Sequence, residues 1–126
     1  MAEEQQRRIL AVVQDLIFAA KIQAAAKRLG VIVEFVQDGN KLLEQTSSCP
    51  TIIIVDLNHA GLNAIDLVGK LQSHAASRDQ RIIGYLSHVQ QELKREAERV
   101  GCDLVLPRSV FSRDLDELLR QHALRV

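Results

Sequence analysis

The stretch TIIIVDLNHAG, residues 51–61, decides the fold of this chain. Its first five residues are all β-branched, which favours a strand that is covered on both faces. The run ends on a carboxylate, Asp56, and a short loop leads from there into a helical pattern. An acid at the end of a buried strand is either a cap for the following turn or a chemical group at the edge of a sheet, as a nucleophile or a metal ligand.

Length and composition indicate one globular domain. The chain has 126 residues, 47% hydrophobic and 25% charged, and sixteen basic against sixteen acidic side chains give a formal net charge of zero. This balance argues against a nucleic-acid partner, which needs a basic excess. No apolar run reaches the ~18 residues of a membrane span, and the polar start has no secretory pattern. Because Cys49 and Cys102 are the two cysteines and lie far apart, we expect reduced thiols in a cytoplasmic protein.

Apolar runs and helical patterns alternate along the chain. We expect residues 1–8 to be a polar lead-in and residues 9–126 to form a single domain. The apolar runs predict strands at 9–15, 31–36, 51–56, 81–87 and 103–107. Helical periodicity predicts helices at 16–30, 41–48, 62–74, 89–101 and 109–126. Strict alternation of strand and helix predicts an α/β fold with a parallel sheet, right-handed crossovers and helices on both faces.

Polar side chains stand at the expected carboxyl ends of several strands. They are Gln14 and Asp15 on the first strand, Asp56 on the third, Ser87 on the fourth and Arg108 after the fifth. Open parallel sheets bind ligands at this edge, near the switch in strand order. Isolated turn caps would have no reason to gather there, so we favour a functional site over a simple cap for Asp56.

The order of these motifs resembles the receiver domains of two-component response regulators, over nearly all of residues 8–125. In that family the third strand ends in a phosphoacceptor aspartate, and IIIVDLNHAGLNAIDLV at 52–68 follows this pattern. The family's fourth strand ends in Thr or Ser, as IIGYLSH at 82–88 does, and AERVGCDLVLPR at 97–108 is similar to the segment that leads into its fifth strand. The resemblance implies a flavodoxin-like, five-stranded parallel sheet in the order 2-1-3-4-5.

The resemblance also implies a role for each polar residue at this edge. Asp56 would accept a phosphoryl group, and Ser87 and Arg108 would contact that group. The implied ligands of Mg²⁺ are Asp15, Asp56 and the backbone carbonyl of Asn58. Gln14 stands where the family has a second acid, and it would orient a water without adding charge. We therefore expect magnesium binding to be weak or lost.

Two alignments of the fifth strand stay open. Counting from Gly101 without gaps places Arg108 where the family has a lysine. Aligning on Pro107 instead places Leu106 at that position and removes the cation. We favour Arg108, because a positive charge near Asp56 suits phosphate. This alignment puts Val105 where family members carry an aromatic switch residue, so we expect the usual aromatic switch to be absent.

Two functions follow from these residues. The first is a phosphorelay receiver that takes a phosphoryl group from a histidine kinase or phosphotransfer protein. It would signal to a downstream protein through the fourth helix, fifth strand and fifth helix, residues 89–124. The second is a phosphorylation-independent pseudo-receiver, a protein-interaction or homodimerisation scaffold in which Arg108 pairs permanently with Asp56. We expect no enzyme with a diffusible substrate, because no separate nucleophile–base pair or nucleotide loop is visible.

Overall fold

A five-stranded parallel sheet forms the centre of the computed structural model, which describes residues 8–45, 52–61, 63–73, 80–87 and 90–123. The strands are β1 (Arg8–Val12), β2 (Ile32–Phe35), β3 (Ile52–Asp56), β4 (Arg81–Leu86) and β5 (Leu104–Pro107). The helices are α1 (Leu16–Leu29), α2 (Gly39–Gln45), α3 (Ala64–Ser73), α4 (Gln91–Val100), α5 (Arg108–Arg113) and α6 (Leu115–Ala123). The strand order β2-β1-β3-β4-β5 confirms the predicted fold class and topology.

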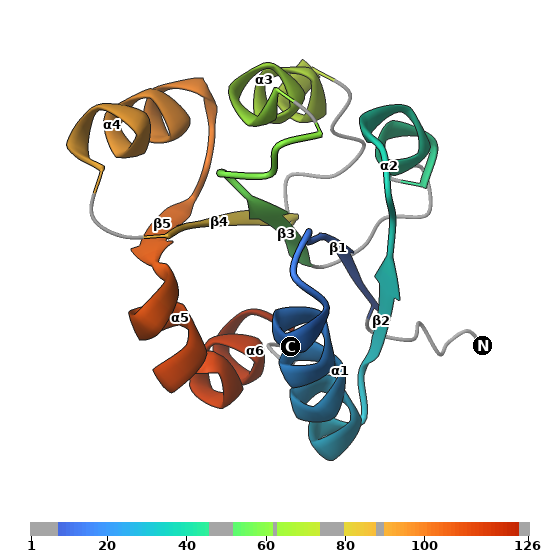
Figure 1. Cartoon of the computed structure of the whole chain (residues 1–126). Helices are drawn as coiled ribbons and strands as arrows, with labels where there is room; N and C mark the ends of the chain where they lie inside the picture. Colours follow the sequence, from blue (N-terminus) through green and yellow to red (C-terminus); the bar gives the residue numbers. More distant parts are fainter. Residues whose placement is uncertain (1–7, 46–51, 62, 74–79, 88–89, 124–126) are drawn as a thin grey trace.

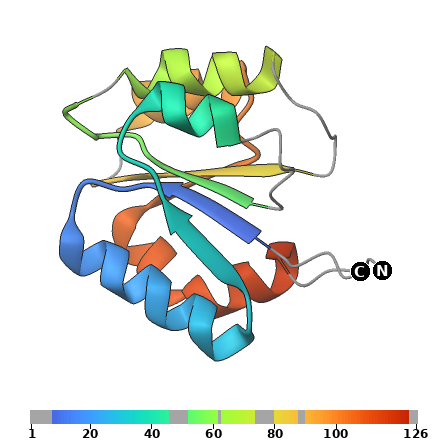
Figure 2. The same cartoon turned by 90° about the vertical axis from the view of Figure 1, so that its right-hand side faces the viewer.

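Helices cover both faces of the sheet. Figure 1 shows α2, α3 and α4 on one face and α1, α5 and α6 on the other, and Figure 2 shows the same three layers from the side. Successive residues of β3 belong to two apolar clusters on opposite faces of the sheet. Ile54 packs on the α1 side, and Ile53 and Val55 pack on the α3 side. Because both faces are covered, β3 is buried along its whole length, as its unbroken apolar run predicts.

Helix α1 has specific residues at both ends. Asp15 is the N-cap, and its Oδ1 accepts the backbone N–H groups of Ile17 at 2.8 Å and Phe18 at 3.3 Å. Gly30 ends the helix with φ 73°, a left-handed conformation that suits glycine, and its N–H donates to carbonyls of the last turn. The expectation that the first strand extends to residue 15 was wrong. β1 ends at Val12, because the chain leaves the ladder so that Asp15 caps α1.

The last predicted helix is broken into two. α5 and α6 replace a continuous helix over 109–126, and Asp114 lies between them with φ −100° and ψ 15°. The Asp114 backbone N–H donates to the carbonyl of Val110, and its carboxylate pairs with Arg113 at 2.9 Å. The break turns the chain, so that Phe111 on α5 and Leu119 on α6 reach the same buried cluster.

Helix α2 begins two residues earlier than predicted. It starts at Gly39, because Asp38 accepts the backbone N–H of Lys41 at 2.8 Å and so stabilises an earlier first turn. The predicted ends of several elements lie outside the described residues. These positions fall within 46–51, 62, 74–79, 88–89 and 124–126.

One of the two cysteines can be placed. Cys102 is a buried free thiol, and burial raises its pKa to about 12, whereas Cys49 lies outside the described residues. Among the helices of the described ranges, none is both long enough and apolar enough to cross a membrane.

Candidate functional site

Asp56 lies at the carboxyl end of β3 and is nearly buried. It is 8% exposed and is the one buried charged residue in the part of the chain that the structure describes. Its Oδ1 accepts the backbone N–H of Asn58 at 3.0 Å, and its Oδ2 accepts that of Gln14 at 3.4 Å. A carboxylate offers about four acceptor positions, so two N–H contacts, one of them long, leave capacity for a further partner.

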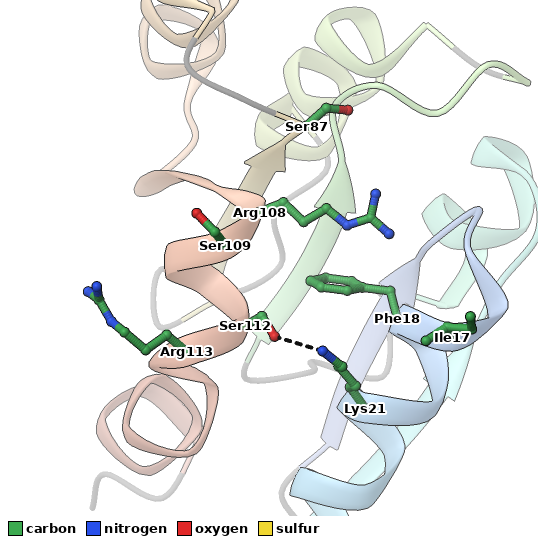
Figure 3. Close-up of a pocket in the computed structure, with 8 residues that line it drawn as sticks. All are labelled: Ile17, Phe18, Lys21, Ser87, Arg108, Ser109, Ser112 and Arg113. Atoms are coloured by element: carbon green, nitrogen blue, oxygen red, sulfur yellow. Dashed lines mark hydrogen bonds between the residues drawn. The ribbon is translucent and has the colours of Figure 1, made fainter.

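An ion pair between Asp15 and Arg108 stands at the same edge of the sheet. Arg108 begins α5 directly after β5, and its Nη2 donates to Oδ2 of Asp15, with the two side chains 36% and 38% exposed. Figure 3 shows Arg108 reaching from α5 toward Phe18 on α1, and the guanidinium lies 4.8 Å from the centre of that ring. Hydrogen bonds from the first turn of α1, followed by the one from Arg108, hold the pKa of Asp15 below its ordinary value.

This ion pair bears on two expectations from the sequence. Arg108 reaches an acidic residue of the edge, whereas Leu106 packs against the buried cluster on the α1 side. The permanent partner that the pseudo-receiver hypothesis gave to Arg108 was Asp56, but the structure pairs Arg108 with Asp15 instead. The reason is geometric, since Asp15 leaves β1 to cap α1 and so faces the start of α5.

Ser87 follows β4 and is tied to the loop after Asp56. Its backbone N–H donates to Oδ1 of Asn58 at 2.7 Å, and its hydroxyl donates to the same oxygen at 3.1 Å. The Asn58 side chain thus fastens the β3–α3 loop to the end of β4. The Ser87 hydroxyl has a single proton, so it must leave Asn58 before it can donate to a group on Asp56.

Gln14 holds the same loop from the side of β1. Its Oε1 accepts the backbone N–H of Ala60 at 3.0 Å, and its own backbone N–H is the one that contacts Asp56. The sequence assigned this amide oxygen to the orientation of a water. In the structure the oxygen positions the loop, a contact between residues 46 positions apart that no local pattern predicts.

One of the carboxylates expected to bind Mg²⁺ is already engaged by other groups of the protein. Both carboxylate oxygens of Asp15 are engaged, Oδ1 by the first turn of α1 and Oδ2 by Arg108. Mg²⁺ requires several oxygen ligands in near-octahedral geometry. The donor set therefore does not fit the ion while Arg108 holds Asp15.

Tyr85 is a residue of this site that the sequence analysis missed. Asp56 and Tyr85 are paired neighbours on β3 and β4, and residues paired across a parallel ladder point to the same face. Tyr85 is 2% exposed, and its ring lies 4.6 Å from that of Phe18 and 5.2 Å from that of Phe111, centre to centre. The available signal was a single tyrosine in an otherwise aliphatic strand, two residues before Ser87.

The hydroxyl of Tyr85 is buried without a hydrogen bond. Within the described ranges, no donor or acceptor reaches it in hydrogen-bonding geometry. Burial, followed by the negative charge of Asp56, raises the pKa of Tyr85 far above its ordinary value, and a weak hydrogen-bonding interaction with the Asp56 carboxylate, short of good geometry, acts in the same direction. The positive charge of Arg108 acts in the opposite direction. The hydroxyl therefore keeps its proton and stands close to the charged groups of the site.

A groove of about 510 Å³ opens beside Arg108 between α1 and α5 (Figure 3). It is lined by Ile17, Phe18, Lys21, Ser87, Arg108, Ser109, Ser112 and Arg113. Lys21 of α1 donates to the hydroxyl of Ser112 on α5 at 3.3 Å across this groove. Leu16 and Ile17, on the first turn of α1, are 83% and 73% exposed. The surface beside Arg108 and the first turn of α1 is thus partly apolar and partly basic.

Known proteins resemble this chain in structure. No protein-family profile and no curated protein matches the sequence. A response regulator signal receiver domain from Bermanella marisrubri is 24% identical, with a TM-score of 0.79 over 96% of this chain and 100% of that one. The chemotaxis response regulator CheY4 of Vibrio cholerae is 21% identical, with a TM-score of 0.76 over 93% and 98%. A CheY-like receiver domain protein from Methanospirillum hungatei JF-1 is 18% identical, with a TM-score of 0.79 over 93% of both chains.

These similarities concern the backbone. At 24% identity and below, they establish that the chain has the fold of the response regulator receiver domains, as the sequence motifs implied. The chemistry of this site has to be argued from its own residues, because one fold supports many functions.

Proposed function

We propose that this chain is a signal receiver module in which Asp56 accepts a phosphoryl group from a histidine kinase or a phosphotransfer protein. One observation carries the proposal. A nearly buried carboxylate ends the central strand, and Ser87, Arg108 and Asp15 gather at the same edge of the sheet. The receiver fold supports this assignment.

The proposed reaction moves a phosphoryl group between two nucleophiles. An oxygen of Asp56 attacks the phosphorus of a phosphohistidine, and the P–N bond breaks with its electron pair going to the imidazole. The new P–O bond makes an acyl phosphate, a covalent intermediate of a known type. The transition state spreads negative charge over the phosphoryl oxygens, so it requires nearby donors and cations.

We assign these roles to side chains that already stand at the edge. Arg108 would exchange Asp15 for a phosphoryl oxygen, to which its planar guanidinium can make two hydrogen bonds. Ser87 would leave Asn58 and donate to a second oxygen. The same release would make the Asp15 carboxylate available to Mg²⁺. Because the ion would have to compete with Arg108 for this carboxylate, we propose that Mg²⁺ binds weakly.

The surface around the site supports a protein partner as phosphodonor. Leu16 and Ile17 are exposed apolar residues directly after Asp15, and the groove beside them carries Lys21. We propose that the donor docks on this side, and that the signal reaches a downstream protein through α4, β5 and the predicted last helix, which the structure divides into α5 and α6. The buried free thiol of Cys102 fits a reducing, cytoplasmic setting, which we also propose. The division into a lead-in at 1–8 and a domain at 9–126 stays a prediction.

The Asp15–Arg108 ion pair favours a second candidate function. It neutralises the acid and the cation that a phosphoryl site needs, and so supports a phosphorylation-independent scaffold for another protein or for a second copy of this chain. The two candidates differ in whether Asp56 can be modified.

Intact-mass measurement after incubation with acetyl phosphate, with and without Mg²⁺, separates them. We expect one added phosphoryl group on the wild type and none on Asp56→Asn. Asp66→Asn is the matched control, because Asp66 is an exposed acid on α3 that pairs with Lys70 away from the site. It should be modified like the wild type. A wild type that gains no phosphoryl group and shows no heat of binding with beryllofluoride would exclude the receiver function and leave the scaffold.

A further inference from the structure

The hydroxyl of Tyr85 is a buried polar group that none of the assigned roles uses. It lies on the strand next to Asp56, on the same face of the sheet. No hydrogen bond satisfies it within the described part of the chain, although buried hydroxyls are normally paired. An unpaired buried donor beside a candidate phosphoacceptor calls for an explanation in terms of the site.

We propose that Tyr85 is a positioning residue, whose hydroxyl donates a hydrogen bond to the phosphoryl group on Asp56 and has no partner while Asp56 is unmodified. This inference rests on the proposed function of Asp56. It adds a donor from the buried cluster between the sheet and α1, whereas Arg108 and Ser87 would donate from the partly exposed edge.

The position of the ring supports this role. Phe18 and Phe111 pack against Tyr85, and both are almost completely buried, so the ring has little freedom to turn away. The hydroxyl is also near enough to Asp56 and Arg108 for both charges to act on it. The Asp56 carboxylate lies close to the hydroxyl, but the two do not form a hydrogen bond of good geometry. A phosphoryl group would extend the acceptor oxygens beyond the carboxylate and bring them within reach of the hydroxyl.

The protonation state supports the role as well. A tyrosine hydroxyl ordinarily keeps its proton up to about pH 10, so it can donate throughout the physiological pH range. A neutral donor adds no charge to a site in which Asp15 already compensates Arg108. Val105 on β5 packs on the opposite face of the sheet, with α3 and α4.

Two variants test the hydroxyl separately from the ring cluster. Tyr85→Phe removes the oxygen and keeps the ring, while Phe111→Leu disturbs the same cluster and keeps the oxygen. Binding of beryllofluoride in the presence of Mg²⁺ is measured by titration calorimetry, and the lifetime of phospho-Asp56 by intact mass. We expect Tyr85→Phe to weaken beryllofluoride binding roughly tenfold and to shorten the phosphoryl lifetime, since hydrogen bonds to charged groups are the strong ones.

The outcomes distinguish this inference from the proposed function. Phe111→Leu should keep more of its beryllofluoride affinity than Tyr85→Phe, because Phe18 still packs against the Tyr85 ring, although this variant unfolds at a lower temperature. Equal affinities for the wild type and Tyr85→Phe would overturn the role of the hydroxyl and leave the function of Asp56 intact. Equal losses in both variants would also overturn it, because they would point to packing. If the wild-type protein neither binds beryllofluoride nor gains a phosphoryl group, both proposals are overturned. This outcome is measured on the wild type alone and does not depend on either variant.

Discussion

The unpaired hydroxyl of Tyr85 makes a prediction about stability that does not depend on phosphorylation. Folding removes this group from water, and the structure offers it no hydrogen bond among the described residues. A buried polar group without a partner costs about 1–3 kcal/mol. The nearby Asp56 carboxylate attracts the hydroxyl proton and offsets part of this cost. We therefore expect Tyr85→Phe to stabilise the unmodified protein by about 1 kcal/mol.

Thermal and urea unfolding, followed by far-ultraviolet circular dichroism, measure this difference. For a chain of 126 residues, about 1 kcal/mol corresponds to a rise in Tm of about 3–5 °C. Tyr85→Leu is the control that removes the ring with the hydroxyl. It loses the ring pairs with Phe18 and Phe111, each worth about 0.5–1.5 kcal/mol beyond area burial, so it should be destabilised by at least about 1–3 kcal/mol.

A decrease in stability of Tyr85→Phe would refute the reasoning. It would mean that the hydroxyl makes a favourable hydrogen bond in the free protein, and that no donor is kept for Asp56. The combination that we expect is therefore specific. Removing one oxygen should make the free protein more stable and its complex with a phosphoryl analogue weaker.

Two further predictions concern the packing behind Asp56 and the ion pair at the edge. Gly84→Ala would place a Cβ 2.8 Å from Cδ1 of the buried Leu57, so its free energy of unfolding in urea should be lower by about 1–3 kcal/mol. Gly69→Ala is the control in α3, where open space surrounds the added Cβ, and its free energy of unfolding should be higher by about 0.5–1 kcal/mol. The folded-state pKa of Asp15 is lowered by the N–H groups of α1 and then by Arg108, so its contribution is present above the unfolded value of about 3.9 and is lost as pH falls through the folded value. The unfolding free energy of the wild type should thus fall more steeply below about pH 4 than that of Asp15→Asn, and parallel pH curves for the two proteins would contradict this.

Local chemistry in the sequence was sufficient for the fold and for part of the site. β-Branched runs that alternate with helical periodicity require a parallel sheet covered on both faces, and the structure has that sheet. Asp56 and Ser87 could be placed at one edge because they end neighbouring apolar runs. Gly30 and Gly101 could be read as helix ends, and both have positive φ.

The tertiary structure alone decided which polar groups of the site meet. The pairing of Asp15 with Arg108 joins residues 93 positions apart, and it depends on β1 ending early so that Asp15 can cap α1. The place of Tyr85 beside Asp56 depends on the register between β3 and β4, which is a non-local choice. Periodicity along the chain reports which face a residue covers, but it carries no information about which residue of another strand or helix will lie opposite. The fold could therefore be predicted from the sequence, while the electrostatics around Asp56 depend on contacts that exist only after the chain has folded.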